Sequence, residues 1–98
     1  MKDYDGKVDY KFLKAMGIDV VKYQPWQLGL FFPDLKGKFL WYPRKGTLMF
    51  EDGKHGEAGR EFYKVGQRGE FPAGYMGDAD STERVYNEIM KKVNEQKS

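Results

Sequence analysis

Hydrophobic and polar residues alternate through the middle of the chain with a period of two, which is typical of β-strands. The first predicted strand places its bulky residues on one face, namely Trp26, Leu28, Leu30 and Phe32. PDLKG at 33–37 and PRKG at 43–46 are turn signals, because proline and glycine stand where hairpin loops favour them. The pattern therefore predicts an antiparallel sheet over 26–65. Its later strands are expected at 38–42, 47–51 and 60–65.

A short helix is expected before this sheet. Asp9 is a suitable N-cap and Gly17 a suitable stop, and Ile18 can fold back onto the last turn. Apolar residues recur at helical spacing between them, at Phe12, Leu13 and Met16. These signals predict a helix over 9–17. A brief β-branched strand is expected at 19–23, ended by the proline that follows.

A longer helix is expected at the end of the sequence. Asp80-Ser81-Thr82-Glu83 has the form of a capping box, which predicts a helix over 80–96. Its apolar stripe consists of Val85, Tyr86, Ile89, Met90 and Val93. Charged residues occupy the opposite side, so this helix is amphipathic and is expected to pack on the sheet.

Together these elements predict one α+β domain over 1–98, because a chain of 98 residues supports a single core. The expected architecture is an antiparallel β-meander of about four strands, with a short N-terminal helix and an amphipathic C-terminal helix packed on the sheet. Residues 1–8 are expected to be frayed, and 66–79 to form a glycine-rich loop.

The alternation leaves bulky residues on both faces of the predicted sheet, so a second layer, a partner or a ligand must cover the second face. If the hairpins pair in simple register, the C-terminal helix covers the first-strand set together with Phe39, Trp41, Leu48, Phe50, Tyr63 and Val65. The opposite face then carries Phe31, Leu40, Tyr42, Met49 and Phe62, interleaved with Lys38, Arg60 and Lys64. We expect the N-terminal helix to close this face. The alternatives are a nucleic-acid platform, on which bases stack on rings, and a protein interface or homodimer.

Composition and charge bear on the cellular location of the protein and on the class of its partner. The chain has no cysteine, no apolar signal-peptide region and no apolar run long enough to span a membrane, so we expect a cytoplasmic protein. The net charge of +2 is too small to indicate nucleic acid by itself. A basic cluster does stand within 33–46, namely Lys36, Lys38, Arg44 and Lys45 against Asp34. Successive turns of a meander lie at opposite ends, so this cluster can separate in space.

Some loop residues match weak catalytic sequence motifs. Pro33-Asp34 followed by Asp52-Gly53-Lys54 matches the PD-(D/E)xK nuclease pattern, in which carboxylates bind a divalent metal. Both dipeptides are also common turn spellings, and turn formation is the favoured interpretation. His55 is the only histidine, and a solvated loop position is favoured over a metal or general-base role. No catalytic residue, cofactor or metal site is predicted.

The sequence thus favours a small non-enzymatic binding module that contacts nucleic acid or a nucleic-acid-handling protein through an aromatic and basic sheet surface. The predicted binding residues are Phe31, Lys38, Tyr42, Arg44, Lys45 and Phe62. One alternative is a small protein-binding inhibitor or adaptor of the kind that phages and mobile elements encode, docking through the aromatic face or a sheet edge. The other is the metal-dependent nuclease. A homodimer through the sheet face or an edge strand also remains open.

Overall fold

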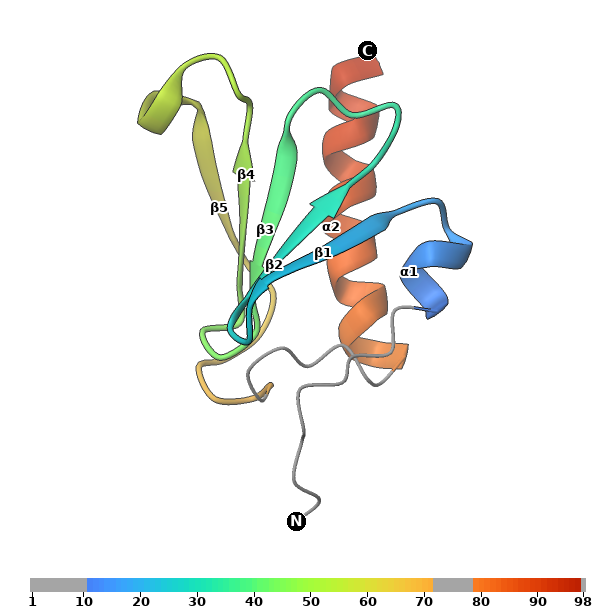
Figure 1. Ribbon diagram of the computed structural model, residues 1–98, viewed down its shortest axis with the longest axis vertical. Helices are drawn as coiled ribbons and strands as arrows, with labels where there is room; N and C mark the ends of the chain where they lie inside the picture. Colours follow the sequence, from blue (N-terminus) through green and yellow to red (C-terminus); the bar gives the residue numbers. More distant parts are fainter. Residues whose placement is uncertain (1–10, 72–78, 98) are drawn as a thin grey trace.

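A computed structural model describes residues 11–71 and 79–97 of the chain (Figure 1). Five strands form one antiparallel sheet in sequence order, and helices precede and follow it. The elements are α1 (Lys11–Ala15), β1 (Asp19–Gln24), β2 (Gln27–Phe31), β3 (Lys38–Tyr42), β4 (Thr47–Glu51), the 3-10 turn η1 (Gly56–Gly59), β5 (Arg60–Lys64) and α2 (Ala79–Lys97). This confirms the α+β meander with its two helices. The sheet has five strands rather than four, because the brief strand predicted at 19–23 belongs to it.

The additional strand, β1, joins the sheet through a tight turn at Pro25-Trp26. Gln24 pairs with Gln27 across this turn, and Val20 pairs with Leu30 further along the hairpin. Proline ends β1, as expected. The turn that follows then folds β1 back onto β2.

The helix ends follow the expected signals where the structure describes them. Gly17 has a φ of +85°, and the backbone N–H of Ile18 donates to the carbonyl of Leu13 at 2.9 Å. Ile18 is buried, so it does fold back onto the last turn of α1. Helix α2 begins at Ala79, one residue before the predicted start. The predictions for the frayed segment 1–8, the N-cap at Asp9, residues 72–78 of the loop and the side chains of the capping box at 80–81 lie outside what the structure describes.

The core lies between the sheet and the two helices. Its largest fully buried side chains from the sheet are Leu28, Leu30, Phe39, Trp41 and Leu48. From α2 come Val85, Ile89 and Val93, which confirms that this helix covers the predicted face. Trp26 is an exception, because it stands in the β1–β2 turn and half of its surface is exposed. The prediction that Trp26 belongs to the core is therefore wrong.

Helix α1 lies on the same side of the sheet as α2 (Figure 1). Leu13 is fully buried in the common core, and the ring of Phe12 meets that of Tyr86 edge-on at 6.0 Å. The prediction that the N-terminal helix closes the second face is therefore wrong. Leu13 and Ile18 belong to the buried core and Phe12 contacts Tyr86 of α2, and these contacts hold the helix on the core side.

The second face, which we call the open face, carries no described helix. Its middle row crosses all five strands, because Val21 pairs with Gly29, Gly29 with Leu40, Leu40 with Met49 and Met49 with Phe62. This register confirms the predicted opposite face. Leu40 and Met49 are buried at its centre, whereas 42% of Val21 and 67% of Phe62 are exposed. The face is therefore apolar at its centre and aromatic at its β5 edge. No described helix is long and apolar enough to cross a membrane.

Candidate functional site

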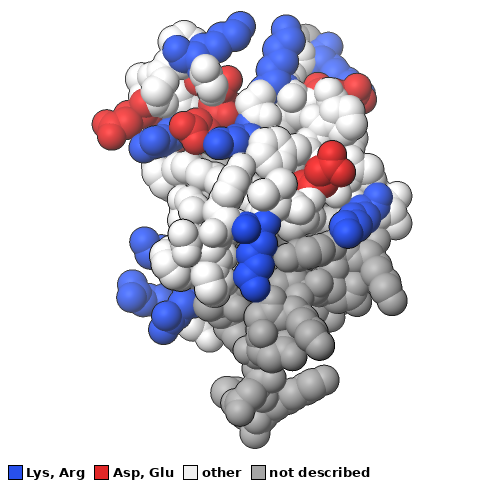
Figure 2. Space-filling view, viewed as in Figure 1, with Lys and Arg blue, Asp and Glu red and all other residues white. Residues whose placement is uncertain are grey.

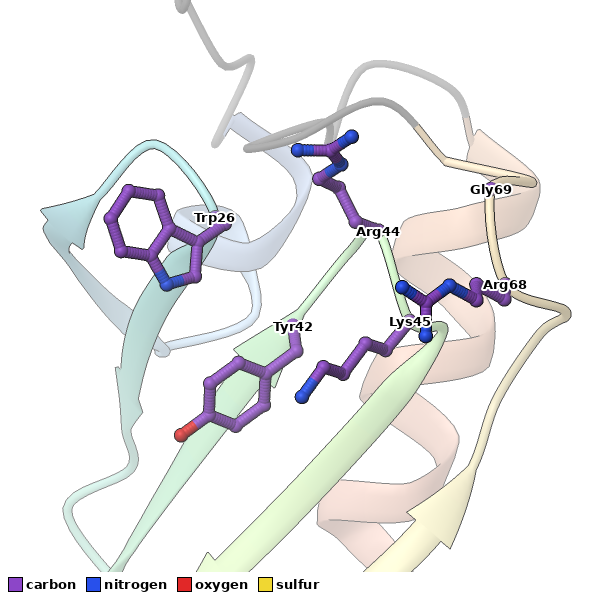
Figure 3. Close-up of a pocket in the computed structure, with 6 residues that line it drawn as sticks. All are labelled: Trp26, Tyr42, Arg44, Lys45, Arg68 and Gly69. Carbon is purple, nitrogen blue, oxygen red and sulfur yellow. The ribbon is translucent and has the colours of Figure 1, made fainter.

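A pocket of about 390 Å³ opens at the end of the sheet where the β1–β2 and β3–β4 turns lie (Figure 3). Its described lining consists of Trp26, Tyr42, Arg44, Lys45, Arg68 and Gly69. These residues come from three stretches of the sequence. Two rings and three cations therefore surround one cavity, which is the most distinctive chemical grouping on the described surface.

The β3–β4 turn builds one wall of the pocket. Its backbone closes tightly, with the N–H of Lys45 donating to the carbonyl of Tyr42 at 3.2 Å and that of Gly46 donating to Pro43 at 3.1 Å. Pro43 is fully buried and anchors the turn. Gly46 has a φ of +65°, a conformation that glycine adopts without steric cost. The turn thus presents Arg44 and Lys45 outward.

Backbone hydrogen bonds bring the loop after β5 against this turn. The carbonyl of Gly46 accepts from the N–H groups of Val65 and Gly66, at 2.8 and 3.0 Å. The N–H of Gly69 donates to the carbonyl of Arg44 at 2.6 Å. A Cβ on Gly46 would lie 2.4 Å from the carbonyl oxygen of Gly66, so only glycine permits this approach. The contact places Arg68 beside the cations of the β3–β4 turn.

Helix α2 fixes the far side of the loop. Glu70 accepts from the backbone N–H of Gln67 at 2.9 Å and from Arg84 at 3.0 Å. The guanidinium of Arg84 also lies 4.9 Å from the ring centroid of Phe71, which is buried in the core. The loop is therefore held at both ends, and Arg68 projects from a braced segment.

The two rings stand on one side of the pocket. The side-chain amide of Gln27 donates to the hydroxyl of Tyr42 at 3.0 Å, which fixes the orientation of that ring. The ammonium of Lys45 lies 5.9 Å from the Tyr42 ring centroid, within the range of a cation–π contact. Figure 3 shows Lys45 and Arg68 directed into the same space beside Tyr42, with Trp26 across from them. The pocket thus offers flat apolar surfaces next to positive charge.

The charge around the pocket is unbalanced. Among the described residues, no salt bridge involves Arg44, Lys45 or Arg68, and no carboxylate lines the cavity. A fourth cation lies close by, because the ammonium of Lys64 donates to the carbonyl of Lys45 at 3.2 Å. In Figure 2 the basic side chains at this end of the sheet have no described acidic residue beside them on the visible face. Such a site attracts an anion.

The opposite end of the sheet has mixed charge. Arg60 lies 3.7 Å from Glu51 and 3.9 Å from Glu57. Lys36 belongs to this end as well, where its backbone exchanges two hydrogen bonds with the side chain of Gln96 at 2.9 Å each. The four-residue basic cluster of the sequence is therefore divided between the two ends of the sheet.

The structure brings together three of the six predicted binding residues, namely Tyr42, Arg44 and Lys45. Lys38 and Phe31 lie on the open face toward the other end, since four residue steps of β3 separate Lys38 from Tyr42, ~13 Å. The ammonium of Lys38 lies 5.7 Å from the ring centroid of Tyr23. Phe62 stands on β5 in the middle row, exposed to solvent.

The residues that match the nuclease pattern make local contacts within their own loops or with a neighbouring side chain. Asp52 accepts from the backbone N–H groups of Lys54 and His55, at 2.8 and 3.0 Å, and forms a 2.6 Å hydrogen bond with the His55 ring. The His55 ring and these two N–H groups hold the pKa of Asp52 well below its ordinary range. Asp34 lies 3.8 Å from the ammonium of Lys97. Over residues 11–71 and 79–97, no group of three His, Asp or Glu residues has a metal-binding arrangement.

Sequence reasoning missed Trp26, Arg68 and Gly69 as pocket residues. The alternation of β2 continues through Trp26 and places it in the core, although Pro25 before it signals a turn. Arg68 carried no such signal, because its place depends on hydrogen bonds between segments twenty residues apart. Comparison of the chain with models of protein families, with curated proteins and with solved structures found no match.

Proposed function

We propose that the protein is a binding module for single-stranded nucleic acid, with the pocket as its main contact and the adjoining open face as an extension. One observation carries the proposal: Trp26 and Tyr42 stand beside Arg44, Lys45 and Arg68 around a cavity whose described lining has no carboxylate. Phosphates require cations, and unstacked bases pack on aromatic rings. The proposal assigns no catalytic step to the chain.

The rings favour a single strand over a duplex. In a duplex the faces of the bases are stacked on one another, so protein rings cannot reach them without unstacking. Trp26 is half exposed and Tyr42 is held by Gln27, so both rings are presented without rearrangement. Base stacking on such rings is worth about 1–3 kcal/mol for each base. A pocket of about 390 Å³ has the size of a site for one small ligand.

The open face offers a path away from the pocket. Lys38 and Phe31 lie at the far end of that face, and Phe62 lies on its β5 edge. A strand anchored in the pocket would pass Lys38 after ~13 Å along β3. These three residues, predicted from the sequence, are proposed as weaker contacts than the pocket.

Binding can be measured by fluorescence anisotropy with a labelled oligonucleotide of mixed sequence, in single-stranded and duplex form. Three cations on phosphates predict that the logarithm of affinity falls with the logarithm of salt with a slope of about −2, since each single-strand contact contributes about −0.7. Tyr42→Ala and Arg68→Ala are expected to weaken binding about tenfold. The matched controls Lys36→Ala and Lys54→Ala remove exposed cations from the other end of the sheet and should leave affinity unchanged. Equal losses in all four variants would contradict the proposal.

Docking of a protein on the open face is the second candidate, in keeping with an inhibitor, an adaptor or a homodimer. It is favoured by the exposure of Phe62 and Val21 at the edges of the apolar middle row. Light scattering tests self-association at high protein concentration, and Phe62→Ser should abolish it if that face is the interface. A monomer at all concentrations excludes the homodimer. An intracellular location, expected from the lack of cysteine, stays a prediction.

A further inference from the structure

We infer that the pocket takes the terminal nucleotide of a strand, with its phosphate present as a free monoester. The inference rests on the proposed function and specifies which part of a nucleic acid the pocket holds. The shared chemistry is a nucleoside monophosphate unit, at the 5′ or the 3′ end of a strand.

The charge of the pocket suits a terminal phosphate. A phosphodiester inside a strand carries one negative charge, whereas a phosphomonoester carries about −1.5 to −2 at pH 7. Arg44, Lys45 and Arg68 line one cavity, whereas a surface that follows a strand would distribute its cations along the backbone. Lys45 and Arg68 point into the space beside Tyr42, and Arg44 points away from them (Figure 3). Two of the three are arginines, whose planar guanidinium groups suit the several oxygens of a terminal phosphate. Three cations, with no carboxylate in the described lining, match a dianion better than a monoanion.

The pocket is closed on one side. The wall between the β3–β4 turn and the loop after β5 is sealed by the hydrogen bonds to the carbonyl of Gly46. A Cβ at Gly46 would already collide with Gly66, so no nucleic-acid chain passes between these segments. A strand can leave the pocket along the open face past Tyr42, but it cannot pass between the β3–β4 turn and the loop after β5. This geometry fits a chain end.

The two rings of the pocket lie at the end of the sheet. Trp26 lies in the β1–β2 turn, beyond the last strand pair, and Tyr42 is the last residue of β3. Both rings therefore mark the limit of the sheet rather than its centre. The base of a terminal nucleotide would stack here while its phosphate reaches the cations beside Tyr42.

The test compares otherwise identical octanucleotides that carry a 5′-phosphate, a 3′-phosphate or hydroxyl groups at both ends, and adds a free nucleoside monophosphate as a fourth ligand. We expect one phosphorylated end to bind about tenfold more tightly than the hydroxyl strand, as new charge-assisted hydrogen bonds predict. This preference should disappear in Arg68→Ala and persist in the control Lys36→Ala. It should also shrink between pH 7.5 and 5.5, because the second pKa of the monoester is about 6.

The outcomes separate the two proposals. Equal affinity for all three strands overturns the terminal-nucleotide inference and leaves single-strand binding intact. A free nucleoside monophosphate that binds as tightly as the best strand overturns it too, since the pocket is then a mononucleotide site. If none of the strands binds, the proposed function itself fails.

Discussion

Gly46 is the residue on which the pocket depends most, and Gly46→Ala tests this directly. The substitution adds one methyl group to a turn whose backbone packs against the loop that carries Arg68. Its φ of +65° is unfavourable for alanine, and the new Cβ would lie 2.4 Å from the carbonyl oxygen and 2.5 Å from the carbonyl carbon of Gly66. Because both neighbours are backbone atoms, the loop itself must move.

The expected loss of stability has two parts. An alanine in the left-handed region costs about 1 kcal/mol. Movement of the loop weakens the hydrogen bonds from Val65 and Gly66 to the carbonyl of Gly46, each worth about 0.5–1.5 kcal/mol. The sum for Gly46→Ala is about 2–4 kcal/mol. Gly53→Ala is the matched control, because Gly53 has a φ of +78° but no atom within 4 Å of its Cβ position. It should lose only the first part.

Urea unfolding at equilibrium measures both variants, and the difference between them isolates the contact between turn and loop. We expect Gly46→Ala to be less stable than Gly53→Ala by about 2 kcal/mol. Oligonucleotide affinity gives a second comparison. It should fall in Gly46→Ala, which displaces Arg68, and remain unchanged in Gly53→Ala. Equal stability of the two variants would refute the argument that close packing at Gly46 positions the pocket.

Three further predictions concern the rest of the molecule. Lys92 is buried, with its ammonium 2.7 Å from Glu61 and 5.0 Å from the Phe50 ring centroid. Burial alone lowers the pKa of Lys92, but its hydrogen bonds with Glu61 and Tyr63 outweigh burial, so the pKa of Lys92 is raised. The hydrogen bond from Lys92 in turn lowers the pKa of Glu61. Lys92→Met should therefore cost about 1–2 kcal/mol at pH 7. The difference in unfolding free energy between the variant and the wild type should become smaller as the pH rises above 10.5, and also as it falls below 4.5. A difference that does not change with pH would argue against the ion pair. Asp52→Ala should lower the urea midpoint at pH 7, and this loss should diminish below pH 3.8 because the pKa of Asp52 is lowered in the folded state. The control Asp34→Ala should have little effect on the midpoint. Equal losses in the two variants would contradict the turn-capping role of Asp52. Trp26→Phe should remove the fraction of tryptophan fluorescence that acrylamide quenches readily, because the remaining Trp41 is fully buried; unchanged quenching would contradict the exposed position of Trp26.

The sequence predicted the faces of the sheet because a buried face demands unbroken alternation. Leu28, Phe39 and Trp41 could be assigned to the core from their spacing alone, and the structure confirms them. The same rule failed at Trp26, where the spacing continues but the chain has already turned at Pro25. Alternation identifies which residues share a face only as far as the strand extends.

Local sequence patterns could not predict two other features of the structure. Leu13 shows that α1 has an apolar side, but no pattern in the helix says which face of the sheet will receive it. Arg68 enters the pocket through the hydrogen bonds around Gly46 and Gly66, which join distant segments. Tyr42, Arg44 and Lys45 could be predicted from the sequence because they lie within four residues around one turn, whereas Trp26 and Arg68 required the fold.

The central claim is that the pocket binds single-stranded nucleic acid through its cations and rings. The most direct measurement is the salt dependence of affinity for a single-stranded oligonucleotide, compared between the wild-type protein and the triple variant Arg44→Ala/Lys45→Ala/Arg68→Ala. The account predicts a slope of about −2 or steeper for the wild type. For the variant it predicts weak binding with a slope no steeper than about −0.7, which is the share that Lys38 on the open face can contribute. A variant that keeps the wild-type affinity and slope would contradict it.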